Sequence, residues 1–319
     1  MPVVRSNIVP LRHAGPAVVA YVKSPVEWFV SNSGWVQGAT GVVLIDTCGT
    51  EQATLDFVRD ARKYSPSADL PLTVVVTHAH GEHHNGVGVA LRDGGIALAA
   101  PGSIDAVKAG PQTYGDVFSC TQWGRLDPPD PAAVHPVAEP RQLDLGDSVV
   151  EVVPVPGVAH TAGDLVVYEP RSGVLFTGDL LFAGDTPMAL QGSIPGWLDA
   201  LDWLEETFPA ARVLVPGHGP VGNPANGTVA ALRCYLNWLL EVTARAAADI
   251  SALATAASRR WPEWRTPERH VGNLMRAYAD QHGCALNKDS AIHAVLQAAG
   301  GRIDLDGRLG SSAPAQRMS

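Results

Sequence analysis

Cysteine is scarce in this chain, with four among 319 residues. Cys48, Cys120, Cys234 and Cys284 lie far apart and form no Cys-x-x-Cys pair. The sequence therefore indicates neither a zinc knuckle nor a disulfide framework. We expect all four to be small buried apolar residues.

Positive charge is also limited. The chain has 23 Lys and Arg against 32 Asp and Glu, a formal net charge of −9, and no dense basic patch. Nucleic acids and anionic membranes recruit such patches, so we expect no nucleic-acid and no membrane partner. A small molecule is the expected partner.

Long apolar runs are missing as well. None approaches the length of a membrane span, and the first twenty residues lack the apolar core of a signal peptide. We therefore expect a soluble cytoplasmic protein. Hydrophobic residues make up 46% of the chain, enough for a full core, and its length suggests one domain with an appendage.

A histidine-rich stretch, residues 77–84, follows an apolar β-branched run at 72–76 that predicts a buried strand. Side chains alternate along extended backbone, so His78 and His80 can point to the same side, while Glu82 and His83 begin the next turn. A solvated polar loop is the alternative. The strand that fixes this backbone favours a metal site.

Three more ligand-type residues each lie beside a glycine at or after an apolar run: His160, Asp179 and His218. Strand ends can hold ligands rigidly, as metal geometry requires. His160 follows the run at 149–155, Asp179 the run at 174–176, and His218 the run at 213–215.

These residues, in this order, resemble the metallo-β-lactamase superfamily, whose pattern is H-x-H-x-D-H, then a His, an Asp in a T-G-D turn and a His in a G-H-G turn. The resemblance implies two zinc ions, with Asp179 bridging them. One ion would be held by His78, His80 and His160, and the other by Glu82, His83 and His218.

The resemblance also implies an α+β fold, the four-layer αββα sandwich. Helical periodicity replaces strands after residue 225. We therefore predict a metallo-β-lactamase-like catalytic domain at 1–225, a helical C-terminal extension packed on it at 226–302, and a flexible tail at 303–319. Asp46 ends a predicted strand that lies beneath the metal loop in the superfamily, so it is either a partner that orients a ligand histidine or a turn-forming residue.

One residue departs from the pattern, because Glu82 stands where the superfamily usually has Asp. Glutamate is still an acceptable oxygen ligand for zinc. The alternative is that Glu82 bonds a neighbouring side chain and only one metal is held.

Zinc with an open coordination position lowers the pKa of bound water from about 15.7 to about 7. The predicted reaction is therefore attack on an ester, thioester, lactone or amide carbonyl, with Asp179 and Glu82 as the catalytic carboxylates. No Ser/His/Asp triad or nucleophilic cysteine arrangement competes with this prediction.

Three further segments, 28–32, 186–193 and 268–274, resemble the superfamily members of bacterial aromatic polyketide pathways, which act as cyclases and thioesterases. This resemblance implies a polyketide substrate, with an acyl carrier protein as a candidate partner. A metal that acidifies β-dicarbonyl groups could promote ring closure. The oligomeric state is open, and a homodimer is one alternative.

Two other functions stay open. One is a general metallo-hydrolase, such as a glyoxalase-II-like thioesterase or a lactonase. The other is a non-catalytic binding protein with a vestigial metal site. A β-lactamase is disfavoured, because nothing in the sequence indicates export.

The remaining pattern predicts the local structure. We expect strands at 18–22, 28–32, 35–37, 42–46, 72–76, 96–100, 141–145, 149–155, 165–168, 174–176 and 213–215. Helices are expected at 50–64, 85–91, 103–108 and 196–208, and four more in the extension. Residues 110–140 read as a long loop, whose aromatic side chains would form a lid or pocket wall, or simply pack on the core.

Overall fold

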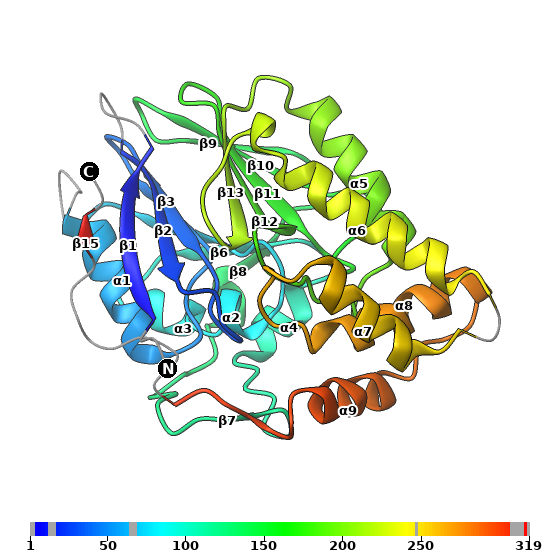
Figure 1. Cartoon of the computed structure of the whole chain (residues 1–319). Coiled ribbons are helices and arrows are strands. Elements are labelled where there is room, and N and C mark those ends of the chain that lie inside the picture. Colours follow the sequence, from blue (N-terminus) through cyan, green and yellow to red (C-terminus); the bar gives the residue numbers. More distant parts are fainter. Residues whose placement is uncertain (1–3, 12–16, 64–68, 246–247, 307–315, 318–319) are drawn as a thin grey trace.

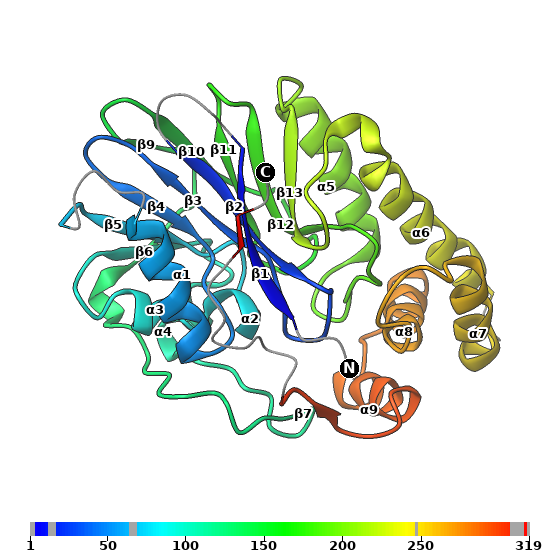
Figure 2. The ribbon, with the colours of Figure 1, turned by 60° about the vertical axis from the view of Figure 1, so that its left-hand side comes forward.

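Two β-sheets lie face to face with helices on both outer sides (Figure 1), which is the predicted four-layer sandwich. This computed structural model describes residues 4–11, 17–63, 69–245, 248–306 and 316–317. Figure 2 shows α1 and α3 on the outside of one sheet and α5 and α6 on the outside of the other. No helix among the described residues is long and apolar enough to cross a membrane.

Among the described residues, the first sheet has eight strands in the order β15-β1-β2-β3-β4-β5-β6-β8. Strands β4, β5, β6 and β8 pair in parallel, so the chain leaves each of them at the same edge. The strands are β15 (Gln316–Arg317), β1 (Arg5–Pro10), β2 (Val18–Ser24), β3 (Ser33–Gln37), β4 (Val42–Ile45), β5 (Leu72–Val75), β6 (Ile96–Ala99) and β8 (Val134–Pro136).

The second sheet has five strands in the described residues, in the order β13-β12-β11-β10-β9. Alternate side chains of both sheets, including Val43, Val75, Val152 and Phe176, form the buried layer between them. The strands are β9 (Arg141–Asp144), β10 (Val149–Pro154), β11 (Leu165–Glu169), β12 (Val174–Phe182) and β13 (Val213–His218). A small separate sheet pairs β7 (Phe118–Ser119) with β14 (Ile303–Asp304).

Helices cover the outer faces. Phe57 and Ala61 of α1 pack on the first sheet, as the helical spacing predicts. Leu201, Leu236 and Leu274 join one cluster over the second sheet, so the extension shares its core with the sandwich. The helices are α1 (Glu51–Lys63), α2 (Gly81–His84), α3 (Val87–Ala90), α4 (Ile104–Ala109), α5 (Ile194–Thr207), α6 (Thr228–Thr243), α7 (Ile250–Arg260), α8 (Arg269–His282) and α9 (Lys288–Ala298), with 3₁₀ turns η1 (Pro131–Ala133) and η2 (Pro224–Asn226). The boundary at residues 225 and 226 stays a prediction.

The predicted strand at 28–32 is wrong. Phe29 has a φ of 61°, which a strand does not allow, and this segment is irregular. The Asn32 amide donates to the carbonyl oxygens of Pro216 and Gly219, at 2.9 and 2.7 Å. These contacts fasten the segment to the end of β13, where His218 lies.

The long loop and the tail are more ordered than predicted. Strand β8 and turn η1 lie within 110–140, although neither has a pattern long enough to read from sequence. Ile303–Asp304, at the start of the expected flexible tail, pairs with β7, and Gln316–Arg317 pairs with β1. Residues 307–315 and 318–319 lie outside the described residues.

The cysteine prediction holds only in part. Cys48 is buried and Cys120 is half-buried, but Cys234 and Cys284 are exposed. The last two lie at the outer side of the helical extension, where a small apolar residue is tolerated without burial.

Candidate metal centre

The predicted ligands come from strand ends and the turns that follow them. His78 and His80 lie directly after β5, and His80 is the N-cap residue of α2. His218 ends β13, beside β12, which carries Asp179. The register of these two parallel strands shifts near Gly178, so the β12 backbone changes direction close to Asp179.

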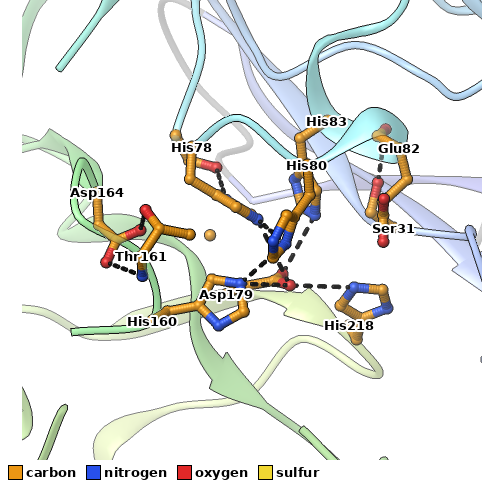
Figure 3. A network of polar contacts seen from close by, with 12 residues as sticks. Ser31, His78, His80, Glu82, His83, His160, Thr161, Asp164, Asp179 and His218 are labelled. Atoms are coloured by element: carbon orange, nitrogen blue, oxygen red, sulfur yellow. Dashed lines mark hydrogen bonds and ion pairs between the residues drawn. The ribbon is translucent and has the colours of Figure 1, made fainter. Parts of the chain in front are cut away.

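Three histidine nitrogens converge at one point of the site (Figure 3). His80 Nδ1 lies 3.0 Å from His78 Nε2 and 3.1 Å from His160 Nε2. A ring nitrogen has one lone pair or one hydrogen, so the two contacts cannot both be ordinary hydrogen bonds. Ligands about 2.05 Å from a tetrahedral zinc ion lie roughly 3.3 Å apart, close to these separations.

Asp179 joins this group to a second one. Its Oδ2 lies 3.4 Å from His160 Nε2 and 3.4 Å from His218 Nε2, and its Oδ1 lies 3.2 Å from His83 Nε2. The carboxylate therefore lies between the two ligand sets. The ligand atoms of each set lie within 4.8 Å of one another; the sets are His78, His80, His160 and Asp179, and Glu82, His83 and His218.

Two buried atoms that face each other, His83 Nε2 and Asp179 Oδ1, have no hydrogen-bond partner. Buried polar atoms in proteins are almost always satisfied. An unsatisfied pair at 3.2 Å, within a set of imidazoles and carboxylates, fits a bound cation. The residues present therefore fit a metal ion.

Asp46 lies beneath the site and orients it. Its Oδ2 accepts from His83 Nδ1 at 2.8 Å and from the Thr77 hydroxyl at 2.8 Å, and its Oδ1 accepts from the Thr77 backbone N–H at 2.7 Å. The Thr77 hydroxyl also lies 3.1 Å from His78 Nδ1. Asp46 thus contacts a ligand histidine, as one of the two predictions held, and keeps the His83 Nε2 lone pair directed into the site.

Burial and mutual charge set the protonation states. Burial lowers the pKa of His78 and His160 well below the usual range, so both are neutral, as metal ligands must be. Burial opposes ionisation of Asp179, but His218 and His83 hold its pKa well below the usual value. Burial likewise opposes a charge on His83, yet Asp179 and Asp46 raise its pKa well above the usual value, so a metal ion that binds Nε2 has to displace a proton there.

Glycine at position 217 permits the close approach of β13 to Asp179. A Cβ there would lie 1.8 Å from Asp179 Oδ1. Gly178 has a φ of 50° and lies against the Thr77 side chain. Both turns therefore need glycine for physical reasons.

A pocket of about 870 Å³, its open mouth included, leads away from the ligands. His80, Glu82, Asp179 and His218 lie at its inner end. The remaining lining is almost entirely apolar or aromatic, with Gln191, Arg269 and Lys288 as the polar exceptions. Such a pocket is the expected form of a small-molecule site.

The three segments 28–32, 186–193 and 268–274 meet at this pocket. The Arg269 guanidinium lies 2.9 Å from the buried Asp185 carboxylate and stacks on the Trp28 ring at 4.1 Å. The Asn273 side chain bonds the Pro187 carbonyl oxygen at 2.8 Å and the Ala189 N–H at 2.9 Å. These contacts hold the 186–191 segment against α8.

All seven predicted ligands lie together, and no predicted ligand lies elsewhere. The sequence reasoning assigned no role to Thr77 and missed the α9 side chains of the pocket. Thr77 precedes the first ligand and could have been found as a hydroxyl neighbour of His78. Nothing in the sequence of α9 distinguishes its pocket-facing residues from an ordinary amphipathic helix.

Comparison with known proteins supports the same conclusion. The family model for the metallo-beta-lactamase superfamily matches residues 26–218. A hydroxyacylglutathione hydrolase of Rhodobacter capsulatus is 29% identical over 193 residues, 60% of this chain and 63% of the relative. Another, from Thermosynechococcus vestitus, is 36% identical over 72 residues, 23% of this chain and 28% of that protein. The chain thus spans less than two thirds of the length of these relatives.

Solved structures agree on the fold. A metallo-β-lactamase from Pontibacter korlensis superimposes with a TM-score of 0.56 at 21% identity, over 73% of this chain and 99% of that one. One from Pseudomonas aeruginosa gives 0.52 at 22% identity, over 73% and 94%. The matched family model shows that the chain belongs to the metallo-β-lactamase superfamily, and the solved structures share its fold.

Proposed function

We propose that this protein is a zinc-dependent hydrolase of thioesters. The observation that carries the proposal is the convergence of five imidazoles and two carboxylates at the closed end of an apolar pocket. The relatives named hydroxyacylglutathione hydrolases support the thioester class. Zinc is favoured by nitrogen ligands completed by carboxylate oxygen.

The ligands divide between two ions. His78, His80 and His160 would hold one, with Asp179 shared between both. Glu82, His83 and His218 would hold the other. When bound, zinc supplies a Lewis acid for the carbonyl oxygen and an acidified water.

The chain supplies the remaining parts of the mechanism. Asp179 is ionised, so its carboxylate can accept the proton of the attacking water and return it to the leaving thiolate. Glu82 is half-buried and lines the pocket, where its carboxylate would hold the second ion. Water adds to the acyl carbon, the C–S bond breaks, and the products are a carboxylic acid and a thiol.

A second, finer candidate is a cyclase or thioesterase acting on an aromatic polyketide, free or bound to an acyl carrier protein. The observation in its favour is that Trp28, Leu190 and Arg269, one from each of the three segments with that resemblance, line the same pocket. Efficient turnover of hydroxyacyl-glutathione, with none of a carrier-bound polyketide, would favour the first candidate alone. A carrier partner, a homodimer and a cytoplasmic location stay predictions.

Metal content and thioester turnover test the main proposal together. The purified protein should hold about two zinc ions per chain, and a chelator should abolish hydrolysis of hydroxyacyl-glutathione or N-acetylcysteamine thioesters, with zinc restoring it. His80→Ala should lose both metal and activity. A protein with no affinity for zinc, or with turnover unaffected by the chelator, would contradict the proposal and favour a vestigial site.

A further inference from the structure

The pocket has two apolar walls beyond the ligands. Aromatic rings of Phe29, Tyr114 and Phe118 form one wall; the Phe29 ring centroid lies 6.2 Å from that of Tyr114 and 5.2 Å from that of Phe118. The other wall is aliphatic and includes Leu190 and Ile292. We call these the aromatic wall and the aliphatic wall.

Helix α9 contributes to the aliphatic wall through Ile292 and Val295. These residues lie outside the stretch 26–218 that matches the family model. Val295 is buried in the same cluster as Phe29 and Phe118, and Ile292 is half-buried. The aliphatic wall therefore includes residues that lie outside the matched family domain.

A C-terminal segment, residues 302–306, fixes α9 to the aromatic wall. The Arg302 guanidinium donates to the carbonyl oxygen of Phe118 at 2.7 Å, and the Ile303 N–H donates to that of Val117 at 3.0 Å. Asp306 accepts from the N–H and hydroxyl of Thr121 at 2.7 and 2.9 Å. Figure 2 shows α9 and β7 side by side below the sandwich. The two walls are thus joined and preformed.

Few polar side chains line the pocket away from the metal ligands. The charge of Arg269 is already engaged by Asp185 and by the Trp28 ring. Lys288 lies at the N-terminus of α9 and is exposed. A polar acyl group placed between the walls would lose its hydrogen bonds to water without replacement, which costs roughly a factor of ten or more in binding.

We propose that the acyl group of the substrate is large and apolar, with six or more carbons, and that Ile292 of α9 determines this specificity. The acyl group lies between the aromatic and aliphatic walls, and its thioester carbonyl lies at the metal centre. Both walls are apolar, so a longer acyl chain buries more apolar surface against them than an acetyl group does. This inference rests on the proposed thioesterase function and names its substrate class.

A series of N-acetylcysteamine thioesters with acetyl, hexanoyl and decanoyl groups tests the inference. Each buried methylene contributes about fourfold. The value of kcat/KM should therefore rise at least tenfold from acetyl to hexanoyl and further to decanoyl. A flat series, or a preference for acetyl, would overturn the inference while leaving the thioesterase proposal intact.

Variants of α9 test whether Ile292 determines the specificity for the acyl group. Ile292→Trp should narrow the pocket and lower kcat/KM for decanoyl at least tenfold more than for acetyl, and Ile292→Ala should lower kcat/KM for decanoyl severalfold. His293→Trp is the matched control, because His293 is exposed on the same helix and does not line the pocket. Equal losses in both tryptophan variants would overturn the role of Ile292.

A binding measurement separates this inference from the catalytic proposal. Calorimetric titration with hexanoate and decanoate should show at least tenfold tighter binding of decanoate, reduced by Ile292→Trp and not by His293→Trp. If no thioester is hydrolysed but this selectivity holds, the thioesterase proposal fails and the apolar acyl site stands. If decanoate binds no tighter than hexanoate, the apolar acyl site fails whatever the activity.

Discussion

Replacing Asp46 with Asn should prevent His83 from binding a metal ion while leaving the shape of the site nearly unchanged. Asp46 Oδ1 accepts the Thr77 N–H, so the oxygen of an asparagine must stay on that side. Its NH₂ group would then face His83 Nδ1 and the Thr77 hydroxyl, where Oδ2 now accepts two hydrogen bonds. An N–H on His83 Nδ1 cannot face this donor.

The consequence is a change of tautomer. His83 would carry its hydrogen on Nε2, which then has no lone pair for a metal ion. Outer partners of this kind typically contribute 10–100-fold to metal affinity, or about 1.4–2.7 kcal/mol. Because His83 belongs to the set with Glu82 and His218, the affinity for the ion held by that set should decrease most.

The assay is zinc stoichiometry and affinity, measured by competition with a chromophoric chelator. Asp46→Asn should hold about one tight zinc ion in place of two, with thioester turnover reduced at least tenfold. Asp60→Asn is the matched control, because Asp60 is equally buried, at 2% exposure, and contacts Lys63 in α1 rather than a ligand. Unchanged stoichiometry in Asp46→Asn, or the same loss in Asp60→Asn, would refute the reasoning.

Three further predictions concern the ligands, the turns and the extension. Glu82→Asp should preserve or strengthen retention of the second zinc ion and Glu82→Ala should lose it; if the alanine variant still holds two ions by elemental analysis, Glu82 is not a ligand. Gly217→Ala should displace Asp179, since its Cβ would lie 1.8 Å from Oδ1, and should weaken zinc retention at least tenfold, whereas Gly115→Ala, with open space around it, should not. Burial lowers the pKa of His270 to about 4, while the unfolded chain protonates it below about 6.5, so unfolding free energy should fall by up to about 3 kcal/mol between pH 6.5 and 4. His270→Gln should reduce that slope in urea titrations at pH 7.0 and 4.5, and an equal slope in both proteins would contradict the assignment.

The ligands could be predicted from sequence because each follows a short apolar run. A buried strand holds the residues at its end rigidly, which favoured a metal site, and the family resemblance supplied the grouping of the ligands. The role of Asp46 was predicted from the superfamily resemblance, with a turn-forming residue as the alternative. The four-layer sandwich was predicted from the family resemblance, because the order of strands and helices alone also fits other α/β folds.

The pocket wall could not be predicted in the same way. Helix α9 packs with the aromatic wall through Val295, and residues 302–306 join the two through contacts between segments 185 residues apart, as at Thr121 and Asp306. Strands as short as β7 and β14 carry no periodic signal, and their pairing is a tertiary contact. The pairing of Ile303–Asp304 with β7 was not expected for this reason, since composition indicates the local preference of a segment and not its tertiary partner.

The failure at 28–32 has a more general cause. Among the described residues, non-glycine residues with positive φ occur at four positions: Phe29, Asp46, Tyr114 and Thr266. Each lies at the pocket or supports it: Phe29 and Tyr114 line it, Asp46 orients His83, and Thr266 bonds the Asp185 carboxylate at 2.5 Å. A left-handed backbone costs roughly 1 kcal/mol or more at such residues, and it persists only where surrounding contacts determine it. The rules that relate sequence to local structure therefore fail at the residues that form the site, because their backbone conformation is set by the site and not by their own preference.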